Sequence, residues 1–408
     1  MNVLWDDTTR KLVEEVRDFV KNEVPADLLR KMDREEIRFA KEFIQAAAAR
    51  NLLGLRFPTE YGGRGLPWTA EVAAIEEVGV LGTALSCNYV MPSIVGEALV
   101  AFGTDAQKKK YLSAIIRAEL FSAEALTEPR GGSDFFGATC SAVKDGNEFV
   151  IRGHKRFIVG GEGADVFLVY ARTDPDTAGH GALSAFLVER SDRLKVEYLY
   201  GLMGTRGGGT ARILLDDVRV PAENLVGPLN GGFQVFNRMM VPERLTSAAG
   251  SLGAGRAALE VAARYTDNRQ AFGKKIRKFQ GVSFRVAESV ARMDAARALT
   301  WAAAVKADSG QDSRRLVSEA KKVSTQAAWD TVNDAMQMMG GIGYTDVYPV
   351  ERLLRDGRLA MIWTGTNEIM NLLIQHEYYT ELLQHGPAGR DIEADALSTD
   401  AESEKVFE

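Results

Sequence analysis

The chain has 408 residues, 46% of them apolar and 26% charged, which is enough for two or three domains with packed cores. Its 56 acidic and 50 basic side chains give a net charge of −6 without a basic block, which argues against a nucleic-acid partner. Cys87 and Cys140 lack the spacing of a disulfide framework, and four scattered histidines lack metal-ligand spacing. We therefore predict no metal site and a reducing compartment.

No segment is predicted to target the chain or anchor it in a membrane. The N-terminus, Met1–Arg10, is polar and acidic, unlike a signal or transit peptide. Uninterrupted apolar stretches, such as Trp301–Val305, are too short to span a bilayer. We therefore expect a cytoplasmic protein without a membrane span.

Residues 1–120 are predicted to form an N-terminal helical domain. Apolar residues recur at helical spacing from Leu12 to Val24, where Pro25 interrupts the pattern. Glu71–Gly82 and Ile94–Phe102 are further helix candidates.

Residues 121–228 are predicted to form a middle β domain, because the periodicity changes after Phe121. Lys144–Asn147 reads Lys-Asp-Gly-Asn between apolar runs, which indicates a hairpin with a two-residue turn. Short strand candidates follow closely: Phe149–Ile151, Phe157–Val159, Val166–Tyr170, Leu183–Val188, Ile213–Leu215 and Val218–Val220. Such spacing favours a compact antiparallel sheet pair or barrel over a parallel sheet.

Residues 229–385 return to helical periodicity and are predicted to form a C-terminal four-helix bundle. The expected helices are long and joined by short connectors: Arg244–Arg264, Val282–Asp308, Ser313–Met339 and Asn367–Leu383. Ala291, Ala295, Ala298 and Ala302 permit close helix approach within the bundle. Residues 386–408 are acidic and poor in apolar residues, which predicts a frayed tail. The fold class expected for the chain is α+β.

The most informative run of the chain is residues 123–134, Ala-Glu-Ala-Leu-Thr-Glu-Pro-Arg-Gly-Gly-Ser-Asp. Between an apolar stretch and a hairpin, its backbone N–H groups and two hydroxyls suit a planar, hydrogen-bonding ligand. The run resembles the flavin-binding signature of the acyl-CoA dehydrogenase family, and the resemblance extends from about Val13 to Tyr379. It implies a helical domain, a β domain and a helical bundle, assembled as a homotetramer (a dimer of dimers) that binds FAD.

The resemblance also implies which residues contact FAD. The isoalloxazine ring is expected between Leu126, Thr127, Gly132 and Ser133, with Phe157, Ile158 and Val159 stacked against it. The segment Arg269–Gly273, with Arg269 and Phe272, matches the one that holds the pyrophosphate of the partner subunit's FAD; a guanidinium suits phosphate oxygens. Further matches to FAD contacts are Gln280, Gln337, Gly340, Gly341, Thr366, Asn367 and Glu368.

Each of these positions has an ordinary structural explanation when it is taken alone. Arg269 is then a surface charge at a helix end, Phe157 a core residue, and Gly340-Gly341 a helix stop. The order and spacing of all of them together favour the FAD site. A Rossmann site is not indicated, because Gly250–Gly255 lies within a helical pattern and is better explained by close helix packing.

Two positions depart from the family pattern next to the flavin. Phe157 replaces the usual Trp and keeps an apolar stacking face, whereas Val159 replaces a Thr whose hydroxyl bonds near flavin N5. One neutral hydrogen bond contributes only about 1 kcal/mol net. We therefore expect a changed flavin potential or acceptor preference and retention of FAD.

The family reaction takes an α-proton from a thioester and passes a β-hydride to the flavin, so it needs a carboxylate base facing the α-carbon. Most members carry this Glu just before a Gly-Thr pair, where this chain has Thr364 followed by Gly365 and Thr366. A neutral hydroxyl is no base without an activator, although the Thr364 N–H is expected to donate to the thioester oxygen. Ser133, Arg244, Thr364 and Gly365 are the expected substrate contacts.

The isovaleryl- and long-chain-type members carry the base on a bundle helix, immediately before an Arg. This chain has Glu243 before Arg244 at that position, and Pro242 suits the first position of a helix. Glu243 is therefore predicted to be the base, its pKa raised by burial and lowered by the helix N-terminus. The alternative is that Glu243 only complements the helix dipole. Arg244 is expected to support CoA or the local fold.

Two charged residues of the signature are unusual for the family. Glu124 replaces an uncharged or aromatic residue and is either an auxiliary acid–base group or a solvated strand end. Arg130 replaces a small residue and meets either an acidic group on an electron acceptor or CoA phosphate, or only solvent.

The predicted function is FAD-dependent dehydrogenation of an acyl-CoA thioester, with a short branched or cyclic acyl group and an electron-transfer flavoprotein as acceptor. Within enzymes, the alternatives are dehydrogenation of a carrier-protein thioester and a flavin oxidase or monooxygenase. A nitroalkane oxidase is disfavoured, because it needs a carboxylate at Thr364. Outside enzymes, the alternative is a catalytically silent relative that binds FAD or acyl-CoA.

Overall fold

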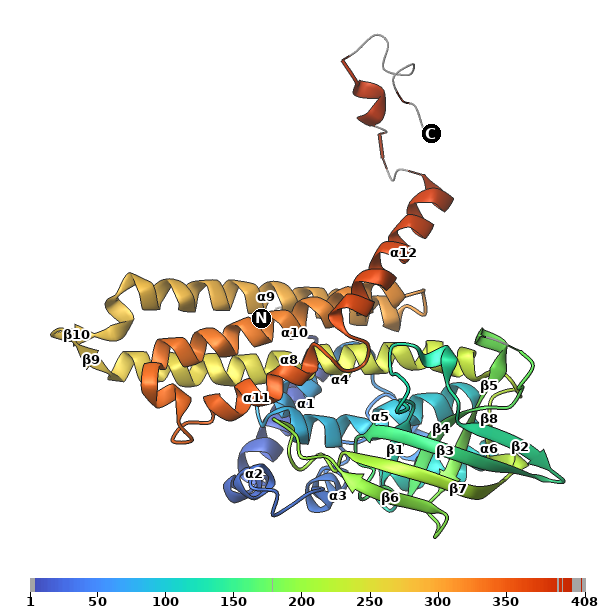
Figure 1. Ribbon diagram of the computed structural model, residues 1–408. Helices are drawn as coiled ribbons and strands as arrows, with labels where there is room; N and C mark the ends of the chain where they lie inside the picture. Colours follow the sequence, from blue (N-terminus) through green and yellow to red (C-terminus); the bar gives the residue numbers. More distant parts are fainter. Residues whose placement is uncertain (1–3, 178, 387–388, 391, 398–404, 406–408) are drawn as a thin grey trace.

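The computed structural model describes residues 4–177, 179–386, 389–390, 392–397 and 405. Helices form both ends of the chain and a β domain lies between them, beside the first part of the long helix α8 (Figure 1). This arrangement confirms the predicted α+β fold. Much of the predicted tail, 386–408, lies outside the described residues.

The N-terminal part consists of helices, and two of them, Trp68–Gly79 and Thr83–Phe102, are buried along most of their length. Its helices are α1 (Asp7–Asn22), α2 (Ala26–Asp33), α3 (Lys41–Ala49), α4 (Trp68–Gly79), α5 (Thr83–Phe102), α6 (Asp105–Gln107) and α7 (Ser113–Ile116). Pro25 is the N-cap of α2, so the predicted interruption is confirmed. The helix predicted at Ile94–Phe102 begins earlier, at Thr83, and continues through Pro92 because nearly all of its residues are buried.

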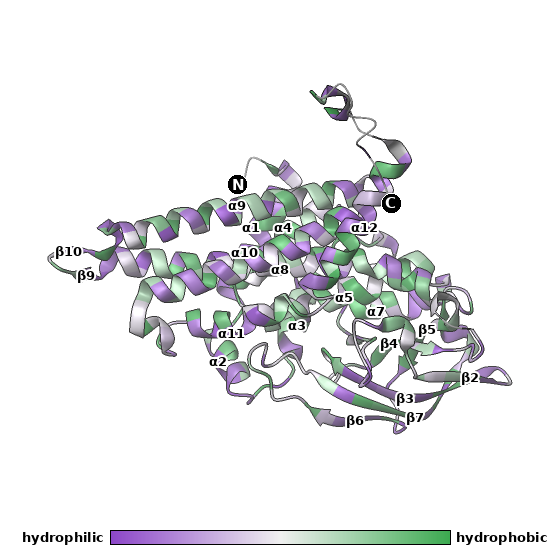
Figure 2. Cartoon of the chain, turned by 45° about the horizontal axis from the view of Figure 1, so that its top comes forward, coloured by the Kyte–Doolittle hydropathy of each residue, from purple (hydrophilic) through white to green (hydrophobic). Residues whose placement is uncertain are grey.

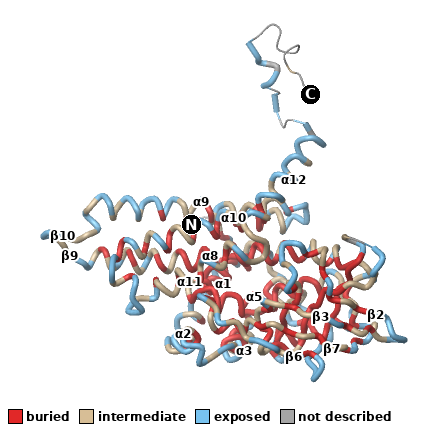
Figure 3. Tube along the Cα trace, viewed as in Figure 1, coloured by how far each residue is buried: buried red, intermediate tan, exposed pale blue. Residues whose placement is uncertain are grey.

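Helix α5 is long and apolar enough to cross a membrane by length and composition, which corrects the expectation that every apolar stretch is too short. However, 78% of its apolar window is buried inside the protein, and α5 lies in the red core of Figure 3. It is mostly green, that is apolar, in Figure 2. A buried core helix passes the same test, so this is weak evidence for a span.

The middle part forms one eight-stranded sheet in the order β6-β7-β3-β2-β4-β5-β8, with β1 paired to β4. Its strands are β1 (Ser122–Ala125), β2 (Ser141–Asp145), β3 (Glu148–Ile158), β4 (Val166–Arg172), β5 (Leu183–Glu189), β6 (Leu194–Leu199), β7 (Ala211–Pro221) and β8 (Leu225–Val226). The β2–β3 hairpin is confirmed, with Gly146 in the left-handed region at φ 61°.

Two details of the predicted sheet are corrected. The two short strands predicted between Phe149 and Val159 form one long strand, β3, and the two predicted between Ile213 and Val220 form another, β7. Both strands continue through irregularities in their pairing, near Gly153 and Asp216. Ser122–Ala125 pairs with β4 in parallel, so the sheet is mixed, although most of its pairs are antiparallel. Its core, which includes Phe149, Phe167 and Phe186, is separate from that of the helices.

The C-terminal part contains the longest helices. They are α8 (Gly232–Asn268), α9 (Gln280–Asp308), α10 (Arg314–Met339), α11 (Val350–Ala360) and α12 (Asn367–His385), with the short pair β9 (Gln270–Ala271) and β10 (Lys274–Lys275) between α8 and α9. Helices α8, α9 and α10 lie alongside one another, and α12 packs on α10 (Figure 1). A Cβ on Gly253 would lie 2.2 Å from the Glu76 carbonyl oxygen, and one on Gly255 would lie 2.8 Å from Met293 Cε, so these glycines of α8 serve close packing against α4 and α9, as predicted.

Candidate active site

The loop after β1 carries the predicted flavin residues, and a buried ion pair supports it. The fully buried Lys155 Nζ lies 2.9 Å from Glu128 Oε1 and donates to the Leu126 carbonyl oxygen at 3.1 Å. Glu128 also accepts from the backbone N–H groups of Thr139 and Cys140, at 2.6 and 3.0 Å. Lys155 and Glu128 therefore hold the backbone at Leu126, and the sequence does not predict this role for them.

The β-domain residues fit a planar cofactor that packs on this loop. Phe157 is 50% exposed at φ 58°, a region that bulky residues rarely occupy, and its ring lies against Tyr200. The N–H groups of Gly132 and Ser133 have no partner among the described residues, and the Arg156 Nε is buried without one. An exposed ring beside unused donors suits an isoalloxazine ring, so these residues fit FAD.

Helix α8 faces this part of the β domain through stacked aromatic rings. Phe236 stacks on Phe135 of the signature loop with ring centroids 4.1 Å apart, and Phe135 makes an edge contact with Tyr170 of β4. Glu243 follows Phe236 by seven residues, which is two helical turns, so it lies on the same face of α8. The packing thus directs Glu243 toward the β domain.

The predicted position of Glu243 within its helix is wrong. Helix α8 begins at Gly232, so Pro242 and Glu243 lie inside it and the helix N-terminus does not lower the pKa of Glu243. Pro242 lacks the N–H that would bond to the Arg238 carbonyl oxygen. The helix continues through it, with Pro242, Glu243 and Arg244 all buried by the surrounding domains.

Three acidic or hydroxyl groups meet at this junction: Glu243 from α8, Glu124 from β1 and Tyr170 from β4. Glu243 is 7% exposed, and its Oε1, the Glu124 Oε1 and the Tyr170 Oη are buried without hydrogen-bond partners among the described residues. The solvated-end interpretation of Glu124 is therefore wrong for this carboxyl. An unpartnered buried acid is costly in a folded protein, which marks a candidate functional site.

Burial shifts the ionisation of all three groups in the same direction. Burial raises the pKa of Glu243, and the Glu124 carboxyl and the Arg244 guanidinium oppose this shift. Burial, followed by the charge of Glu243, raises the pKa of Glu124 well above its ordinary value. Burial and the two carboxylates likewise raise the pKa of Tyr170. A base with a raised pKa accepts a proton more readily, provided that it is ionised.

The segment that replaces the usual base packs over α8. Trp363 Nε1 donates to Ser247 Oγ at 2.8 Å, one turn beyond Glu243, and the buried Lys321 Nζ donates to the Gly365 carbonyl oxygen at 2.8 Å. Thr364 has φ 50°, which is strained for a β-branched residue, and its hydroxyl is buried without a partner. Its N–H is also unpaired among the described residues.

Arg244 points to the helices rather than to the acid cluster. It is 3% exposed, and its Nη1 donates to Ser318 Oγ of α10 at 2.9 Å. Burial lowers the pKa of Arg244 to about 10, with Glu243 opposing that shift. The geometry fits the expected support of the local fold. Arg130, the other unusual cation, bonds to Asp134 and to the Gly137 carbonyl oxygen within its own loop.

Most of the remaining predicted FAD residues lie at the far end of the bundle. Arg269 and Phe272 flank the β9–β10 turn, which projects from the molecule away from the β domain (Figure 1), and Phe272 is 94% exposed. Gln280 begins α9, and Gln337, Gly340 and Gly341 end α10 near the same tip. One chain therefore does not bring this group together with Leu126 and Phe157. Thr366 caps α12 by accepting from Ile369 N, and Glu368 is exposed.

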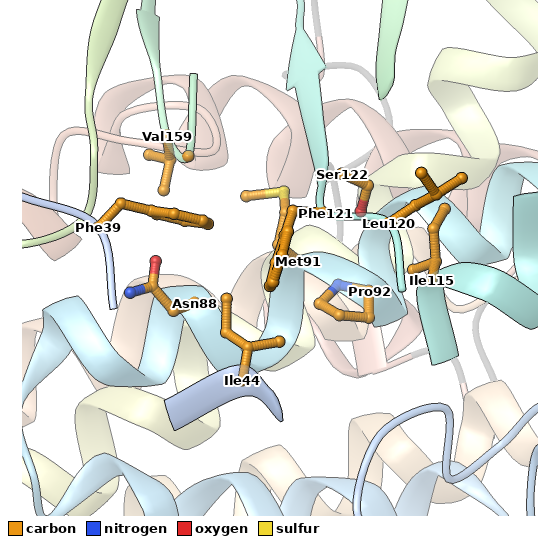
Figure 4. Close-up of a pocket in the computed structure, with 11 residues that line it drawn as sticks. Phe39, Ile44, Asn88, Met91, Pro92, Ile115, Leu120, Phe121, Ser122 and Val159 are labelled. Carbon is orange, nitrogen blue, oxygen red and sulfur yellow. The ribbon is translucent and has the colours of Figure 1, made fainter. Parts of the chain in front are cut away.

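A cavity of about 10 Å³ lies behind Val159, among Phe39, Met91 and Phe121 (Figure 4). Within the described part of the chain, the Asn88 Oδ1 and the Ser122 Oγ at its wall lack hydrogen-bond partners. This volume suits about one water molecule and no acyl group.

Tyr170, Lys321 and the supporting role of Glu128 are not predicted from the sequence. Tyr170 stands in a run of apolar residues, and only the parallel pairing of β1 with β4, with Glu124 opposite Leu168, brings its hydroxyl to Glu124. The signal available in the sequence was a phenol inside an otherwise apolar strand, which needs a partner when buried.

The fold and the site fit an enzyme that binds a planar cofactor, and comparison with known proteins gives the family. Residues 6–119, 123–218 and 230–378 match the N-terminal, middle and C-terminal domains of acyl-CoA dehydrogenase. The chain belongs to the acyl-CoA dehydrogenase family, whose members are FAD-containing oxidoreductases that act on CH–CH groups.

Relatives of known name cover nearly the whole chain. An acyl-CoA dehydrogenase of Bacillus subtilis is 35% identical over 88% of this chain and 94% of its own length. A mitochondrial isovaleryl-CoA dehydrogenase of Solanum tuberosum is 33% identical over 93% and 92%.

Two solved structures show the same fold. The butyryl-CoA dehydrogenase of Megasphaera elsdenii has a TM-score of 0.89 at 30% identity and covers 92% of this chain and 99% of its own. The prolyl acyl carrier protein oxidase AnaB has a TM-score of 0.86 at 28% identity, covering 92% and 99%.

Proposed function

We propose that this protein removes an α-proton and a β-hydride from a short branched or cyclic acyl-CoA thioester, with Glu243 as the base. The observation that carries the proposal is the buried, unpartnered Glu243 carboxyl facing the β domain, while the usual base position holds Thr364. The smaller Thr364 side chain leaves room for a branched or cyclic group.

The residues of the chain divide the chemistry between them. Glu243 takes the α-proton, and its burial favours this transfer by raising its pKa. The unpaired Thr364 N–H donates to the thioester oxygen and stabilises the developing enolate charge. Ser247 of α8, which accepts from Trp363, and Lys321 of α10, which donates to Gly365, hold that N–H in place. FAD, when bound at Leu126, Thr127, Gly132, Ser133 and Phe157–Val159, supplies the acceptor for the β-hydride.

The complete cofactor site is proposed to need a second subunit of a homotetramer. Arg269, Phe272, Gln280, Gln337, Gly340 and Gly341 lie too far along the bundle to serve the same chain's β domain, so they would hold the FAD of a partner. Ala291, Ala295, Ala298 and Ala302 of α9 are exposed, which corrects their predicted place inside the bundle and leaves a flat face for another copy. An electron-transfer flavoprotein in the cytoplasm is proposed as the acceptor, as in the family.

The test is an anaerobic panel of acyl-CoA thioesters offered to the FAD-loaded enzyme, with flavin absorbance as the readout. We expect bleaching by a short branched or cyclic thioester, and loss of bleaching in Glu243→Gln by about 10²–10⁴-fold in rate. Thr364→Glu in the Glu243→Gln background should restore part of the rate, because it returns a carboxylate to the usual position. Bleaching by Glu243→Gln at the wild-type rate would sink the assignment of the base.

The same chemistry on a carrier-protein thioester is the second candidate, favoured by the similarity to AnaB. The panel separates the two by including each acyl group on CoA and on a phosphopantetheinylated carrier. Faster bleaching by the loaded carrier selects this second candidate.

A further inference from the structure

Glu124 lies on the same face of β1 as a predicted flavin contact. Ala123 and Ala125 are fully buried in the core of the β domain, so the alternate residues Ser122, Glu124 and Leu126 point to the opposite face, toward the helices. Leu126 is expected beside the isoalloxazine ring. The Glu124 carboxyl therefore reaches the junction of β domain and helices where the substrate is proposed to bind.

The groups that face this carboxyl come from two elements, Tyr170 from β4 and Glu243 from α8. Arg244 follows Glu243 on the same helix. Arg244 acts on Glu243 and bonds to Ser318, away from Glu124. Two acids thus share one desolvated space, and the nearby cation favours a negative charge on Glu243 alone.

From this geometry we infer that Glu124 and Glu243 hold one proton between them at neutral pH, with Glu124 as the neutral acid and Glu243 as the ionised base. The inference rests on the proposed function, since it describes the resting state of the proposed base. Two carboxylates that share one buried site do not both ionise without a cation between them. With both protonated, the site would have no base.

This arrangement makes Glu124 a positioning residue that prepares the base. Its O–H donates toward Glu243 and stabilises the carboxylate form. When the α C–H bond of the substrate breaks, the proton moves to Glu243 and the electron pair enters the thioester enolate. FAD, when bound, would supply the oxidant that accepts the β-hydride. The pair holds two protons until one returns to solvent after the product leaves.

Two substitutions of Glu124 separate its role as a hydrogen-bond donor from the effect of its negative charge. Glu124→Gln keeps an N–H donor to Glu243 and removes the ionisation of Glu124. The rate of flavin reduction in this variant should therefore no longer fall at alkaline pH, but it should still fall at acidic pH, where Glu243 becomes protonated. Glu124→Leu removes the donor, so the acid limb should move up by about one pH unit. FAD content and circular dichroism show whether each variant is folded.

A readout independent of turnover is the infrared difference spectrum of the resting enzyme at neutral pH, wild type against Glu124→Gln. We expect a protonated carboxyl band in the wild type that the variant lacks. Absence of that band, or an unchanged pH profile in both variants, overturns the shared proton. If Glu243→Gln also reduces its flavin normally, the proposed function fails; if it is inactive, only the shared proton fails.

Discussion

Buried glutamates occupy two regions of this protein, and their surroundings differ. Between α4 and α5, Glu97 accepts from Arg56 and Arg238, each at 2.6 Å, and Arg56 also bonds to Glu71. Burial alone would raise the pKa of Glu97, but these guanidinium groups hold that pKa below its ordinary value. At the junction with the β domain, Glu243 is buried and Glu124 is half-buried with its Oε1 inaccessible. Neither has a guanidinium or lysine hydrogen-bond partner among the described residues, and the pKa values of both are raised.

The difference teaches that burial of an acid does not by itself mark a site. Acids that are paired with a guanidinium group join the helices of the scaffold and stay ionised. Burial of an acid without such a partner destabilises the folded protein, which indicates a functional role for that acid. The same contrast appears within the β domain, where Lys155 holds the pKa of Glu128 below its ordinary value against the effect of burial. Glu124, four residues earlier, has no lysine.

The largest effect on stability is expected when the ion pairs of Arg56 with Glu71 and Glu97 are removed. Arg56→Met leaves Glu71 and Glu97 buried with at most one guanidinium, and should lower the free energy of unfolding by about 3–5 kcal/mol. Urea unfolding at neutral pH measures it. Arg10→Met, which removes an exposed ion pair with Asp7, is the control and should change stability by less than about 1 kcal/mol. Equal effects of the two substitutions would contradict the contrast.

The unpaired region should respond to substitution in the opposite direction. The folded-state pKa of Glu124 lies above its unfolded value, so its stabilising contribution is present below the unfolded pKa and is lost as pH rises through the folded pKa. Glu124→Gln should therefore be more stable than wild type at alkaline pH, by about 1–3 kcal/mol, with the gain vanishing near pH 4. Thermal unfolding across pH measures this. A variant less stable at alkaline pH would show that the carboxyl is paired after all.

A smaller effect is expected under the Thr364 segment. Burial and Arg244 lower the pKa of Lys321 to about 7, so the contribution of Lys321 is present above the unfolded pKa, near 10, and is lost as pH falls through 7. Relative to Lys321→Met, the wild type should gain about 1 kcal/mol or more between pH 7 and pH 10. Lys322→Met, on the neighbouring half-buried residue, is the matched control for loss of a lysine from this helix. Parallel pH curves for the wild type and Lys321→Met would contradict the prediction.

Much of the fold followed from the sequence because its signals are local. Helical periodicity, the Asp-Gly-Asn turn and the signature run are each read within a short window, and the structure bears out the helical and β segments. The first turn expected at Pro242 is wrong because Pro usually starts helices, whereas here packing against the N-terminal helices, the β domain and α10 carries α8 through it. The alanine face of α9 was misplaced because small residues suit both an interior and an interface.

The site was only partly predictable because its central feature is a long-range meeting. Glu243 was picked out by its neighbour Arg244 and by the vacancy at Thr364. Its proximity to Glu124 depends on the parallel β1–β4 pair and on the Phe135–Phe236 stack, and neither leaves a periodic signal. A four-residue strand such as Ser122–Ala125 is too short for periodicity to detect.

The most direct test of the central claim follows proton removal without hydride transfer. A CoA thioester with α-protons and no β-hydrogen is incubated with the FAD-loaded enzyme in D₂O, and α-deuteration is followed by NMR. The account predicts exchange by the wild type and by Glu260→Gln, an exposed control on the same helix, and exchange about 10²–10⁴-fold slower in Glu243→Gln. Exchange by Glu243→Gln at the wild-type rate would contradict it.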